Sequence, residues 1–454
     1  MFIFHHSIFN YRDYILKLSG WGKFPILDTQ LFAPKNIDEL IAEVKKGQLI
    51  ARGNGRSYGD SSIGKKITIS MKNFNQIVSF DENNGLITAE SGVLLKDLIE
   101  FVLPKGWFLF VTPGSKFVTL GGMIAADVHG KNHHKDGNFS NYVEWIDILN
   151  SEGEIQRCSK TQNTELFKWT MGSMGLTGII VKAAIKLRKV ESAWIKLKTI
   201  STKNLDETMN IFDQHNSSTY SVAWIDCLQK KNFGRSIVML GEHAKFEDLN
   251  SNLKRMPYSA PKKLSISVPF NLPSFFLNYW TVKLFNSIYF WKNNKNLKKK
   301  LIDLDSYFYP LDKVYGWNKI YGRRGFSQFQ CVIPLKNSRK GLQELIETVQ
   351  KSKVGCFLSV LKKFGPESGN FSFPMRGFTL ALDFPVNQKS LNLMNDLDEI
   401  TTKFGGRFYL AKDSRMSKKT FKNSENRLEL FKNYRNKLQN KKVFDSHQSE
   451  RLGL

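Results

Sequence analysis

The sequence predicts an α+β protein with two domains, and three observations support this fold class. A chain of 454 residues is longer than one hydrophobic core usually serves. Residues 47–95 alternate short apolar runs with glycine turns, without the regular β-α-β alternation of a doubly wound sheet. From about residue 191 glycine becomes sparse and aromatic residues become frequent, which indicates a second domain.

The first part of the chain is predicted to be rich in strands. Short apolar runs bounded by turn residues predict strands at 48–52, 67–70, 77–80, 86–90, 143–149 and 178–186. The run at 94–103 has helical spacing and stops before Pro104 and Gly106, so we expect a helix there. A turn is expected at 151–153.

The second part is predicted to contain strands at 328–333, 355–361 and 378–384, with helices between them. Residues 269–291 form an aromatic-rich segment broken by prolines, and the basic run 292–301 follows at once. Aromatic side chains beside lysines suit contact with a membrane surface or entry of a lipid phosphate. A buried amphipathic helix with a solvated end explains the same pattern equally well.

The chain is strongly basic, with 67 Lys and Arg against 41 Asp and Glu and a formal net charge of +26. Nucleic acid, an anionic membrane or a phosphorylated substrate would each complement this charge, and so would simple solvation of a basic protein. The sequence contains no recognisable nucleic-acid-binding motif, so we expect no nucleic acid partner.

The four cysteines indicate neither disulfides nor a zinc site, because none has CxxC spacing, and a reducing compartment is expected. They are Cys158, Cys227, Cys331 and Cys356. The N-terminus lacks the features of a signal peptide, and no run approaches the ~20 apolar residues of a membrane-spanning helix. We therefore expect a cytoplasmic protein, with peripheral contact to the inner membrane left open.

Two glycine-rich segments, at 51–60 and 112–134, indicate a cofactor site. Glycines let successive backbone N–H groups converge on a pyrophosphate, although the first segment taken alone also fits a plain glycine turn. The spacing is not Gly-x-Gly-x-x-Gly and no β-α-β unit surrounds it, which disfavours a Rossmann site. In the second segment, Gly121, Gly122 and Ala126 leave room for a flat ring against the backbone. A flavin nucleotide fits both segments.

The histidines at 129, 133 and 134 lack a cysteine partner and the His-Glu-x-x-His pattern, so no metal site is expected. His129 and Lys131 are instead expected to face the flavin and its substrate. Histidine suits proton transfer from an alcohol, and a lysine beside the flavin would stabilise its anionic reduced ring.

Specific motifs in these and later segments resemble the vanillyl-alcohol-oxidase/PCMH family of FAD-dependent oxidoreductases. They are Ala-Arg-Gly-Asn-Gly-Arg-Ser-Tyr-Gly-Asp at 51–60, His-Gly-Lys-Asn-His-His at 129–134 and Ala-Lys-Asp-Ser-Arg at 411–415, with shorter matches at 18–23, 325–334, 361–366 and 450–454. The resemblance implies a PCMH-type FAD-binding domain at 1–190, an antiparallel-sheet substrate domain at 191–406, and a segment at 407–454 that returns to the FAD domain.

The same resemblance implies roles for individual residues. FAD would be held by Ala51, Arg52, Gly53, Asn54, Gly55, Arg56, Ser57, Tyr58, Gly59, Asp60, Ser61, Gly114, Thr119, Leu120, Gly121, Gly122, Ala126, Asp127, Val128, His129, Ile179 and Tyr409. Substrate would contact Lys131, Gln328, Gln330, Lys362, Thr379 and Ala381, with Lys412, His129 and Tyr58 as catalytic residues. Related sugar oxidases have a FAD-linked histidine where this chain has Arg56, so FAD is expected to be noncovalent. Thr379 and Ala381 replace an Asn and a Cys of better-known members.

The implied activity is oxidation of the 2-hydroxyl of a polyprenyl-phosphoryl pentofuranose, a ribose, to a 2-keto sugar. His129 or a Lys412–Tyr58 network would take the hydroxyl proton. A short-chain NAD(P)H-dependent reductase would then complete an epimerisation used in cell-envelope polysaccharide synthesis. Two alternatives remain open: an alditol or aldonolactone oxidase that reduces oxygen, and a noncatalytic basic binding protein.

Overall fold

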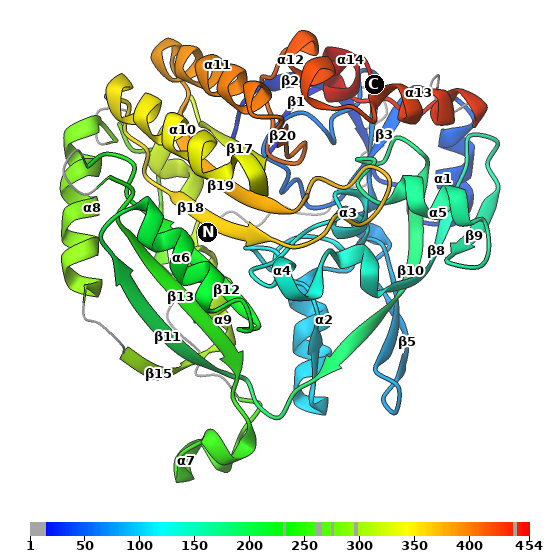
Figure 1. Cartoon of the computed structure of the whole chain (residues 1–454). Coiled ribbons are helices and arrows are strands. Elements are labelled where there is room, and N and C mark those ends of the chain that lie inside the picture. Colours follow the sequence, from blue (N-terminus) through cyan, green and yellow to red (C-terminus); the bar gives the residue numbers. More distant parts are fainter. Residues whose placement is uncertain (1–14, 230–232, 260–265, 274–276, 295–297, 439–442) are drawn as a thin grey trace.

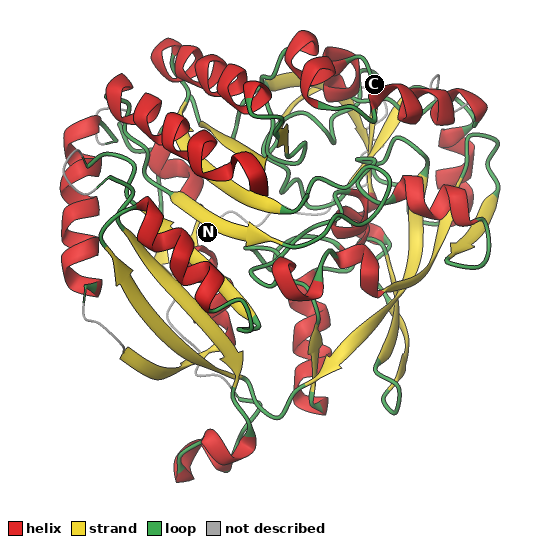
Figure 2. Cartoon of the chain, viewed as in Figure 1, coloured by secondary structure: helices red, strands yellow, loops and turns green. Residues whose placement is uncertain are grey.

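Three large β-sheets, with helices packed around them, organise the chain (Figures 1 and 2). The structure is a computed structural model that describes residues 15–229, 233–259, 266–273, 277–294, 298–438 and 443–454. Most strand pairs are antiparallel and the helices are interspersed, which confirms the α+β class.

The first sheet has the strand order β1-β2-β4-β3 and is partly parallel. Its strands are β1 (Ile15–Ser19), β2 (Ile26–Phe32), β3 (Leu49–Arg52) and β4 (Ile67–Ser70). Helix α1 (Ile37–Val44) begins at Asn36, whose side chain accepts a hydrogen bond from the backbone N–H of Glu39. Leu40 and Val44 of α1 are fully buried in the same cluster as Leu49 of β3.

The second sheet is antiparallel and completes the N-terminal part. Its order is β5-β6-β10-β8-β9, and β7 also pairs with β10. The strands are β5 (Ile77–Asp81), β6 (Leu86–Glu90), β7 (Trp107–Leu109), β8 (Val143–Leu149), β9 (Ile155–Ser159) and β10 (Ile179–Lys189). Four further helices accompany it: α2 (Leu95–Val102), α3 (Leu120–Ala125), α4 (His133–Asp136) and α5 (Thr164–Thr170).

The third sheet has eight strands in the order β15-β11-β13-β12-β18-β19-β17-β20. They are β11 (Trp194–Thr202), β12 (Tyr220–Ile225), β13 (Ser236–His243), β15 (Lys298–Asp303), β17 (Phe326–Pro334), β18 (Ser359–Phe364), β19 (Gly377–Pro385) and β20 (Arg407–Phe408). Helices α6 (Leu205–Gln214), α10 (Ser338–Ser352) and α11 (Gln388–Lys403) contact its strands and lie together on its outer side in Figure 1. Because strand side chains alternate between faces, the other face is free to line a site.

The remaining elements lie outside the three large sheets, and the C-terminal residues lie beside the first sheet. They are α7 (Ser251–Lys254), α8 (Tyr279–Asn293), α9 (Leu304–Phe308), α12 (Lys418–Ser424), α13 (Leu428–Lys437), α14 (His447–Leu452) and the two-stranded ribbon β14 (Ile266–Ser267) with β16 (Val314–Tyr315). Phe444 forms a parallel bridge with Leu49, and Arg451 Nη2 lies 2.7 Å from Asp60 Oδ1. The red C-terminal helices therefore lie next to the blue N-terminal strands (Figure 1).

The strands predicted from the sequence occur with small shifts, and one is displaced. The strand expected at 355–361 begins only at Ser359. A Cβ on Gly355 would lie 3.0 Å from the carbonyl oxygen of Asn278, so this stretch packs against the start of α8 before it joins the sheet. The predicted helix at 94–103 is α2, followed by a 3-10 turn that ends at Gly106 with φ of +80°.

The aromatic segment at 269–291 lies partly outside the described residues, and its second half forms α8. The basic run that follows was not expected to be a strand, but Lys298–Asp303 pairs along β11 as β15. Within the described ranges, no helix has both the length and the hydropathy needed to cross a membrane.

Candidate active site

A cavity of about 740 Å³ lies between the two glycine-rich segments and the third sheet. The glycine-rich segments supply one part of its wall, and β17, β18 and β19 supply another. Its size is typical of cofactor and substrate sites.

The two glycine-rich segments touch each other although about sixty residues separate them. Asn54 Nδ2 donates a hydrogen bond to the carbonyl oxygen of Phe117 at 2.8 Å. A Cβ on Gly53 would lie 2.1 Å from Thr119 Oγ1, and one on Gly121 would lie 2.8 Å from Ser91 Cβ. Glycine is therefore required for this close approach, which leaves backbone rather than side chains along the cavity.

Several buried polar atoms in the cavity wall have no hydrogen-bond partner among the described residues. They include Tyr307 Oη and, on or beside the glycine-rich segments, Ser61 Oγ, Ser91 Oγ, Arg56 Nε and His129 Nδ1. Buried polar groups in native proteins are nearly always paired, so these atoms are suited to a polar ligand. Their positions beside the glycine cradle fit the phosphates, hydroxyls and ring edge of FAD. The Arg56 guanidinium lies 4.0 Å from the Trp21 ring centroid, which holds its charge at the wall.

The third sheet presents polar side chains to the cavity through its strand register. Gln330 on β17 is opposite Ala381 on β19, and Gln328 is opposite Asp383. Lys362 on β18 is opposite Thr379 on β19. Directly opposed residues in an antiparallel pair share a face, so one local register brings distant segments together.

A chain of hydrogen bonds fixes the tautomer of His129. Thr379 Oγ1 donates to the carbonyl oxygen of Cys331 at 2.8 Å and so accepts from Gln330 Nε2 at 3.3 Å. The same Gln330 amide donates to His129 Nε2 at 3.2 Å, which places the ring proton on Nδ1. Burial, followed by the charge of Lys362, holds the pKa of His129 well below its ordinary value. His129 is therefore a neutral ring whose Nδ1–H is available to a ligand.

Lys412, Tyr58 and Asp383 form a second buried group. Lys412 Nζ lies 3.5 Å from the centroid of the Tyr58 ring. Burial lowers the pKa of Lys412, and the Asp383 charge opposes that change. Asp383 accepts hydrogen bonds from Gln328 Nε2 and, at 3.5 Å, from Tyr321 Oη. Burial raises the pKa of Tyr58 well above its ordinary value, so its phenol stays protonated.

Two further lysines, Lys131 and Lys362, line the cavity and are half-buried. Lys131 Nζ donates to the carbonyl oxygen of Tyr307 and lies 4.2 Å from the Tyr307 ring centroid. Burial, assisted by the charge of Lys362, lowers the pKa of Lys131 to about 7. Burial lowers the pKa of Lys362 to about 8. Neither amine forms an ion pair with a carboxylate among the described residues, and the opposite charge of an anionic ligand would favour the protonated form of both.

Most of the residues singled out from the sequence line this one cavity. They are Ala51, Gly53, Asn54, Gly55, Arg56, Ser57, Tyr58, Ser61, Gly114, Thr119, Gly121, Gly122, Ala126, Val128, His129, Lys131, Gln328, Gln330, Lys362, Ala381, Tyr409 and Lys412. Tyr409 Oη donates to the carbonyl oxygen of Ala126 at 3.4 Å, which ties the C-terminal segment to the cradle.

The other seven lie outside the cavity lining: Arg52, Gly59, Asp60, Leu120, Asp127, Ile179 and Thr379. Arg52 donates to the carbonyl oxygen of Ser19, Asp60 pairs with Arg451, and Asp127 accepts from Ser140 and Asn138. Leu120 and Ile179 are core residues, although Gly178 and Ile180 reach the cavity. Arg52, Asp60 and Asp127 therefore support the cavity wall from behind, through their hydrogen bonds and ion pairs with neighbouring residues.

Sequence reasoning missed Asp383 and Asp312. Asp383 follows Ala381 by two positions on β19, so strand alternation could have placed it on the same face. Asp312 lines the cavity and accepts a hydrogen bond from the backbone N–H of Lys116 at 2.7 Å. Burial raises the pKa of both carboxyl groups, to about 7 for Asp383. No local signal marked Asp312, because it reaches the site through a short 3-10 turn.

His133 and His134 have structural partners. His133 Nε2 lies 2.6 Å from Asn138 Oδ1, and its Nδ1 accepts from the backbone N–H of Gly365 at 3.1 Å. His134 Nε2 lies 2.8 Å from the carbonyl oxygen of Ser218. The described residues contain no cluster of three His, Cys, Asp or Glu side chains suited to a metal ion. The four cysteines are buried free thiols.

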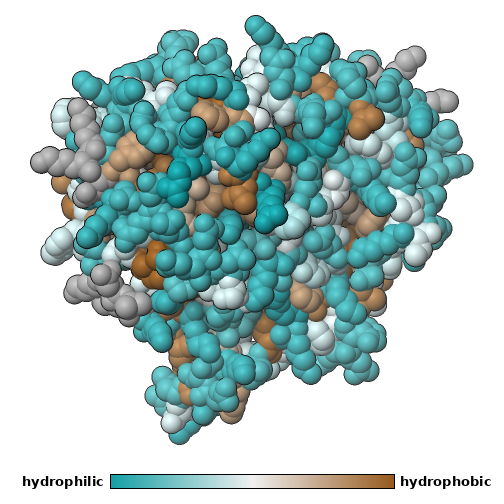
Figure 3. Space-filling model, in the orientation of Figure 1, coloured by the Kyte–Doolittle hydropathy of each residue, from teal (hydrophilic) through white to brown (hydrophobic). Residues whose placement is uncertain are grey.

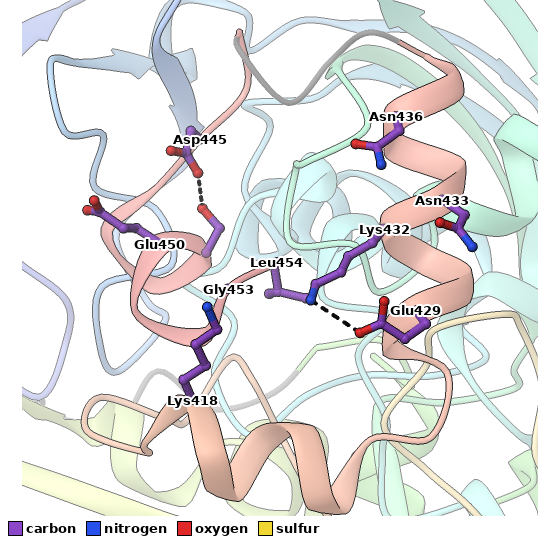
Figure 4. Close-up of a pocket in the computed structure, with 10 residues that line it drawn as sticks. Lys418, Glu429, Lys432, Asn433, Asn436, Asp445, Glu450, Gly453 and Leu454 are labelled. Atoms are coloured by element: carbon purple, nitrogen blue, oxygen red, sulfur yellow. Dashed lines mark hydrogen bonds and ion pairs between the residues drawn. The ribbon is translucent and has the colours of Figure 1, made fainter.

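A smaller cavity of about 370 Å³ lies among α12, α13 and α14 and shares no lining residue with the main one (Figure 4). Lys432 Nζ is 3.3 Å from Glu429 Oε1, and Lys418 extends toward Gly453. Ser449 Oγ donates a hydrogen bond to Asp445 Oδ1, and Glu450 pairs with Lys65 outside this cavity.

Comparison with known proteins places the site in a family. A profile described as an FAD binding domain matches residues 29–159. The chain is also 33% identical over 452 residues to the decaprenylphosphoryl-beta-D-ribose oxidase of Mycolicibacterium smegmatis (strain ATCC 700084 / mc(2)155), covering 96% of this chain and 97% of that protein. The chain belongs to the decaprenylphosphoryl-β-D-ribose oxidase family. It is an FAD-dependent oxidoreductase that acts on CH–OH groups.

Two further relatives cover less of this chain. An uncharacterized protein of Streptomyces coelicolor is 30% identical over 373 residues, or 80% of this chain and 100% of that protein. The D-arabinono-1,4-lactone oxidase of Kluyveromyces lactis (strain ATCC 8585 / CBS 2359 / DSM 70799 / NBRC 1267 / NRRL Y-1140 / WM37) is 28% identical over 165 residues, 34% of this chain and 31% of that protein. The lactone oxidase therefore shares only part of the chain.

Proposed function

We propose that this flavoprotein oxidises the 2-hydroxyl of a polyprenyl-phosphoryl pentofuranose, a ribose, to a 2-keto sugar. The observation that carries the proposal is the joint cavity wall. Lys131 and Lys362, both half-buried, supply positive charge, and Trp224, Phe285 and other apolar side chains line the same cavity. A sugar phosphate with an apolar tail matches both parts. The full-length similarity to an oxidase of decaprenylphosphoryl-beta-D-ribose supports the same substrate class.

FAD is proposed to lie along the glycine cradle, held without a covalent bond. Gly53, Gly114 and Gly121 would give it backbone contacts, while Ser61 and Ser91 would supply hydroxyl groups. Arg56 stands where covalent relatives have a histidine, and its guanidinium lacks a nucleophilic nitrogen. When bound, FAD supplies the two-electron acceptor for alcohol oxidation.

Lys412 is proposed as the base that takes the proton of the substrate hydroxyl. Its lowered pKa leaves the amine partly neutral near neutral pH, which a proton acceptor requires. His129 is less suited to this role, because its Nε2 already accepts from Gln330. We assign His129 Nδ1–H to orienting a ligand oxygen, and Tyr58 to holding the Lys412 amine through its ring face.

The remaining cavity residues are proposed to bind the sugar phosphate. Lys131 and Lys362 would pair with the phosphate or the sugar hydroxyls, and Gln328 and Gln330 would order the ring. Ala381 leaves a small wall beside Gln330, and Thr379 holds the Gln330 amide from behind. Because Ala381 stands where better-known members have a cysteine, thiol-directed inhibitors would have no thiol to react with at this position.

The same proposal divides the chain by task. Residues 1–190 and 407–454 would form the FAD-binding domain, and residues 191–406 the substrate domain. Strand β20 at Arg407–Phe408 still belongs to the third sheet, so the two parts share this edge. A short-chain NAD(P)H-dependent reductase is the proposed partner that reduces the 2-keto sugar and completes the epimerisation.

Product analysis tests the proposal. The holoprotein is incubated with a short-chain polyprenyl-phosphoryl ribose and an artificial electron acceptor, and the sugar is examined by mass spectrometry. We expect a product two hydrogens lighter, and no reaction with the 2-deoxy analogue. A protein that ignores the lipid sugar but oxidises xylitol or an aldonolactone would contradict the proposal and favour the alditol or lactone oxidase alternative.

A further inference from the structure

Helix α8 (Tyr279–Asn293) carries an exposed apolar stripe. Trp280 is 72% exposed, Leu284 63%, Ile288 54% and Trp291 78%. With about 100° of rotation per residue, these four side chains fall within an arc of about 80° on the helix. The opposite side is anchored in the protein, because Val282 and Asn286 are buried and Asn286 Nδ2 donates to Asp226 Oδ1 at 3.0 Å.

Basic residues border this stripe. Lys283 lies about 60° to one side of Trp280 and Lys292 lies about 40° beyond Ile288 on the other, by the same rotation. Helix α8 contains no Asp or Glu. Exposed Lys299 and Lys300 on β15 add positive charge beside it, and Figure 1 shows β15 below α8 at the edge of the molecule. Much of the face seen in Figure 3 is hydrophilic by contrast.

The stripe is continuous with the main cavity through the same helix. Phe285, Tyr289 and Asn293 of α8 line the cavity, as does Lys300 of β15. The Phe285 and Phe357 ring centroids lie 5.1 Å apart, so the apolar cavity wall runs into the exposed helix. A lipid bound there would meet apolar side chains from the helix surface to the interior.

We propose that α8 docks on an anionic lipid bilayer, with its exposed stripe inserted at the interface and its lysines against the headgroups. Tryptophan suits this position because its ring is apolar and its N–H is polar. The two tryptophans near the helix ends, the lysine borders and the absence of acidic residues are the features of an interfacial helix. This inference rests on the proposed function, since docking would pass a polyprenyl-phosphoryl sugar from the bilayer into the cavity.

Vesicle sedimentation tests the docking. The FAD-loaded protein is mixed with vesicles of neutral phosphatidylcholine, or with vesicles in which about one third of the lipid is anionic phosphatidylglycerol. The fraction of protein that sediments with the vesicles is then measured. We expect binding to the anionic vesicles that weakens as salt rises, together with a blue shift of tryptophan fluorescence. The double variant Trp280→Ser/Trp291→Ser should lower the partition coefficient by about tenfold or more, because each indole contributes apolar area.

Matched variants separate the stripe from general surface effects. Leu430→Ser removes another exposed apolar helix side chain, on α13, and should bind vesicles like the wild type. Lys283→Glu/Lys292→Glu should abolish the preference for anionic vesicles, whereas Lys168→Glu on α5 should not. All variants should keep bound FAD and oxidise a short, water-soluble lipid-phosphoryl ribose at the wild-type rate, because the substituted residues do not line the cavity.

Two results would overturn the docking proposal. The first is that the wild type and Trp280→Ser/Trp291→Ser bind anionic vesicles with equal affinity, or that neither protein binds them. The other is a wild-type dimer that becomes monomeric in the same variant, which would assign the stripe to a second copy of the chain. If instead the proposed oxidase function were wrong, the protein would still bind anionic vesicles, but no lipid-phosphoryl ribose would reduce the flavin.

Discussion

The two walls of the main cavity are built in opposite ways. The N-terminal wall is made of glycines and backbone, held by contacts such as Asn54 to Phe117. The wall from the third sheet is made of side chains on neighbouring strands, with the Lys362 amine and with amides that hydrogen-bond to Asp383 and Thr379. One wall depends on the close approach of backbone at its glycines, and the other depends on the charge and hydrogen bonding of its side chains.

This contrast separates two kinds of sensitivity. Added atoms should harm the glycine wall, where neighbouring groups are already in contact, whatever their charge. Altered charge or hydrogen bonding should harm the sheet wall and Lys412 beside it, where burial lowers the pKa of the Lys362 and Lys412 amines. FAD binding and turnover can therefore be disturbed independently.

The largest expected effect is at Lys412, which follows β20 at the edge of the sheet wall. Lys412→Ala should lower turnover by about a thousandfold, the usual contribution of a general base, while bound FAD stays at the wild-type level. The measurement is the rate of flavin reduction in stopped flow beside the flavin-to-protein absorbance ratio. Lys403→Ala, which removes an exposed lysine paired with Glu344, is the control and should change neither quantity. An active Lys412→Ala enzyme would refute the assignment.

The glycine wall offers a matched pair. Gly53→Ala should lower the free energy of unfolding of the FAD-free protein by about 1–3 kcal/mol, because its Cβ would meet Thr119 Oγ1. A Cβ at Gly114 would have no atom within 4 Å, so Gly114→Ala should leave the free energy of unfolding unchanged and weaken only FAD binding. Thermal melts without FAD and fluorescence titration with FAD measure the two effects. If both substitutions lowered the free energy of unfolding equally, close packing at Gly53 would not distinguish it from Gly114.

The pH dependence of turnover sharpens the role of Asp383. Its carboxylate opposes the burial that lowers the pKa of Lys412, so Asp383→Asn should lower that pKa further. The neutral amine would then persist at lower pH, and the acidic limb of the kcat profile should move to lower pH. Each unit of movement corresponds to about 1.4 kcal/mol. A limb that stays in place or moves upward would show that Asp383 does not act on the base.

A smaller effect is expected behind the wall. Thr379→Val removes the hydroxyl that accepts from Gln330, and should cost about 1 kcal/mol, or about fivefold in kcat/KM. Thr379→Ser keeps the hydroxyl and should behave like the wild type. If valine and serine give the same kcat/KM, the Gln330 orientation does not depend on residue 379.

The glycine wall was predictable from sequence and the sheet wall mostly was not. Local glycine density marks residues 51–60 and 119–122, because turn geometry is encoded within a few residues. The pairing of Gln328 with Asp383, or of Lys362 with Thr379, depends on a register set by the whole third sheet. Residues of that wall were named through a family resemblance rather than from pattern.

Tertiary pairing also explains the structural surprises. The lysine-rich β15 has little strand character of its own and is held by six paired positions along β11. The stripe on α8 follows helical spacing, yet sequence alone could not tell whether it faced the core or solvent. The exposed fractions of Trp280 and Trp291 answer that question.

The central claim is that the bound flavin is reduced by a polyprenyl-phosphoryl ribose. The most direct measurement is the visible spectrum of the purified holoprotein during anaerobic addition of that substrate. We predict that the flavin absorption bleaches with the lipid sugar and not with free ribose, xylitol or a galactonolactone. A yellow protein that bleaches only with a free sugar or lactone would contradict the substrate assignment, and a protein that binds no FAD would contradict the account at its foundation.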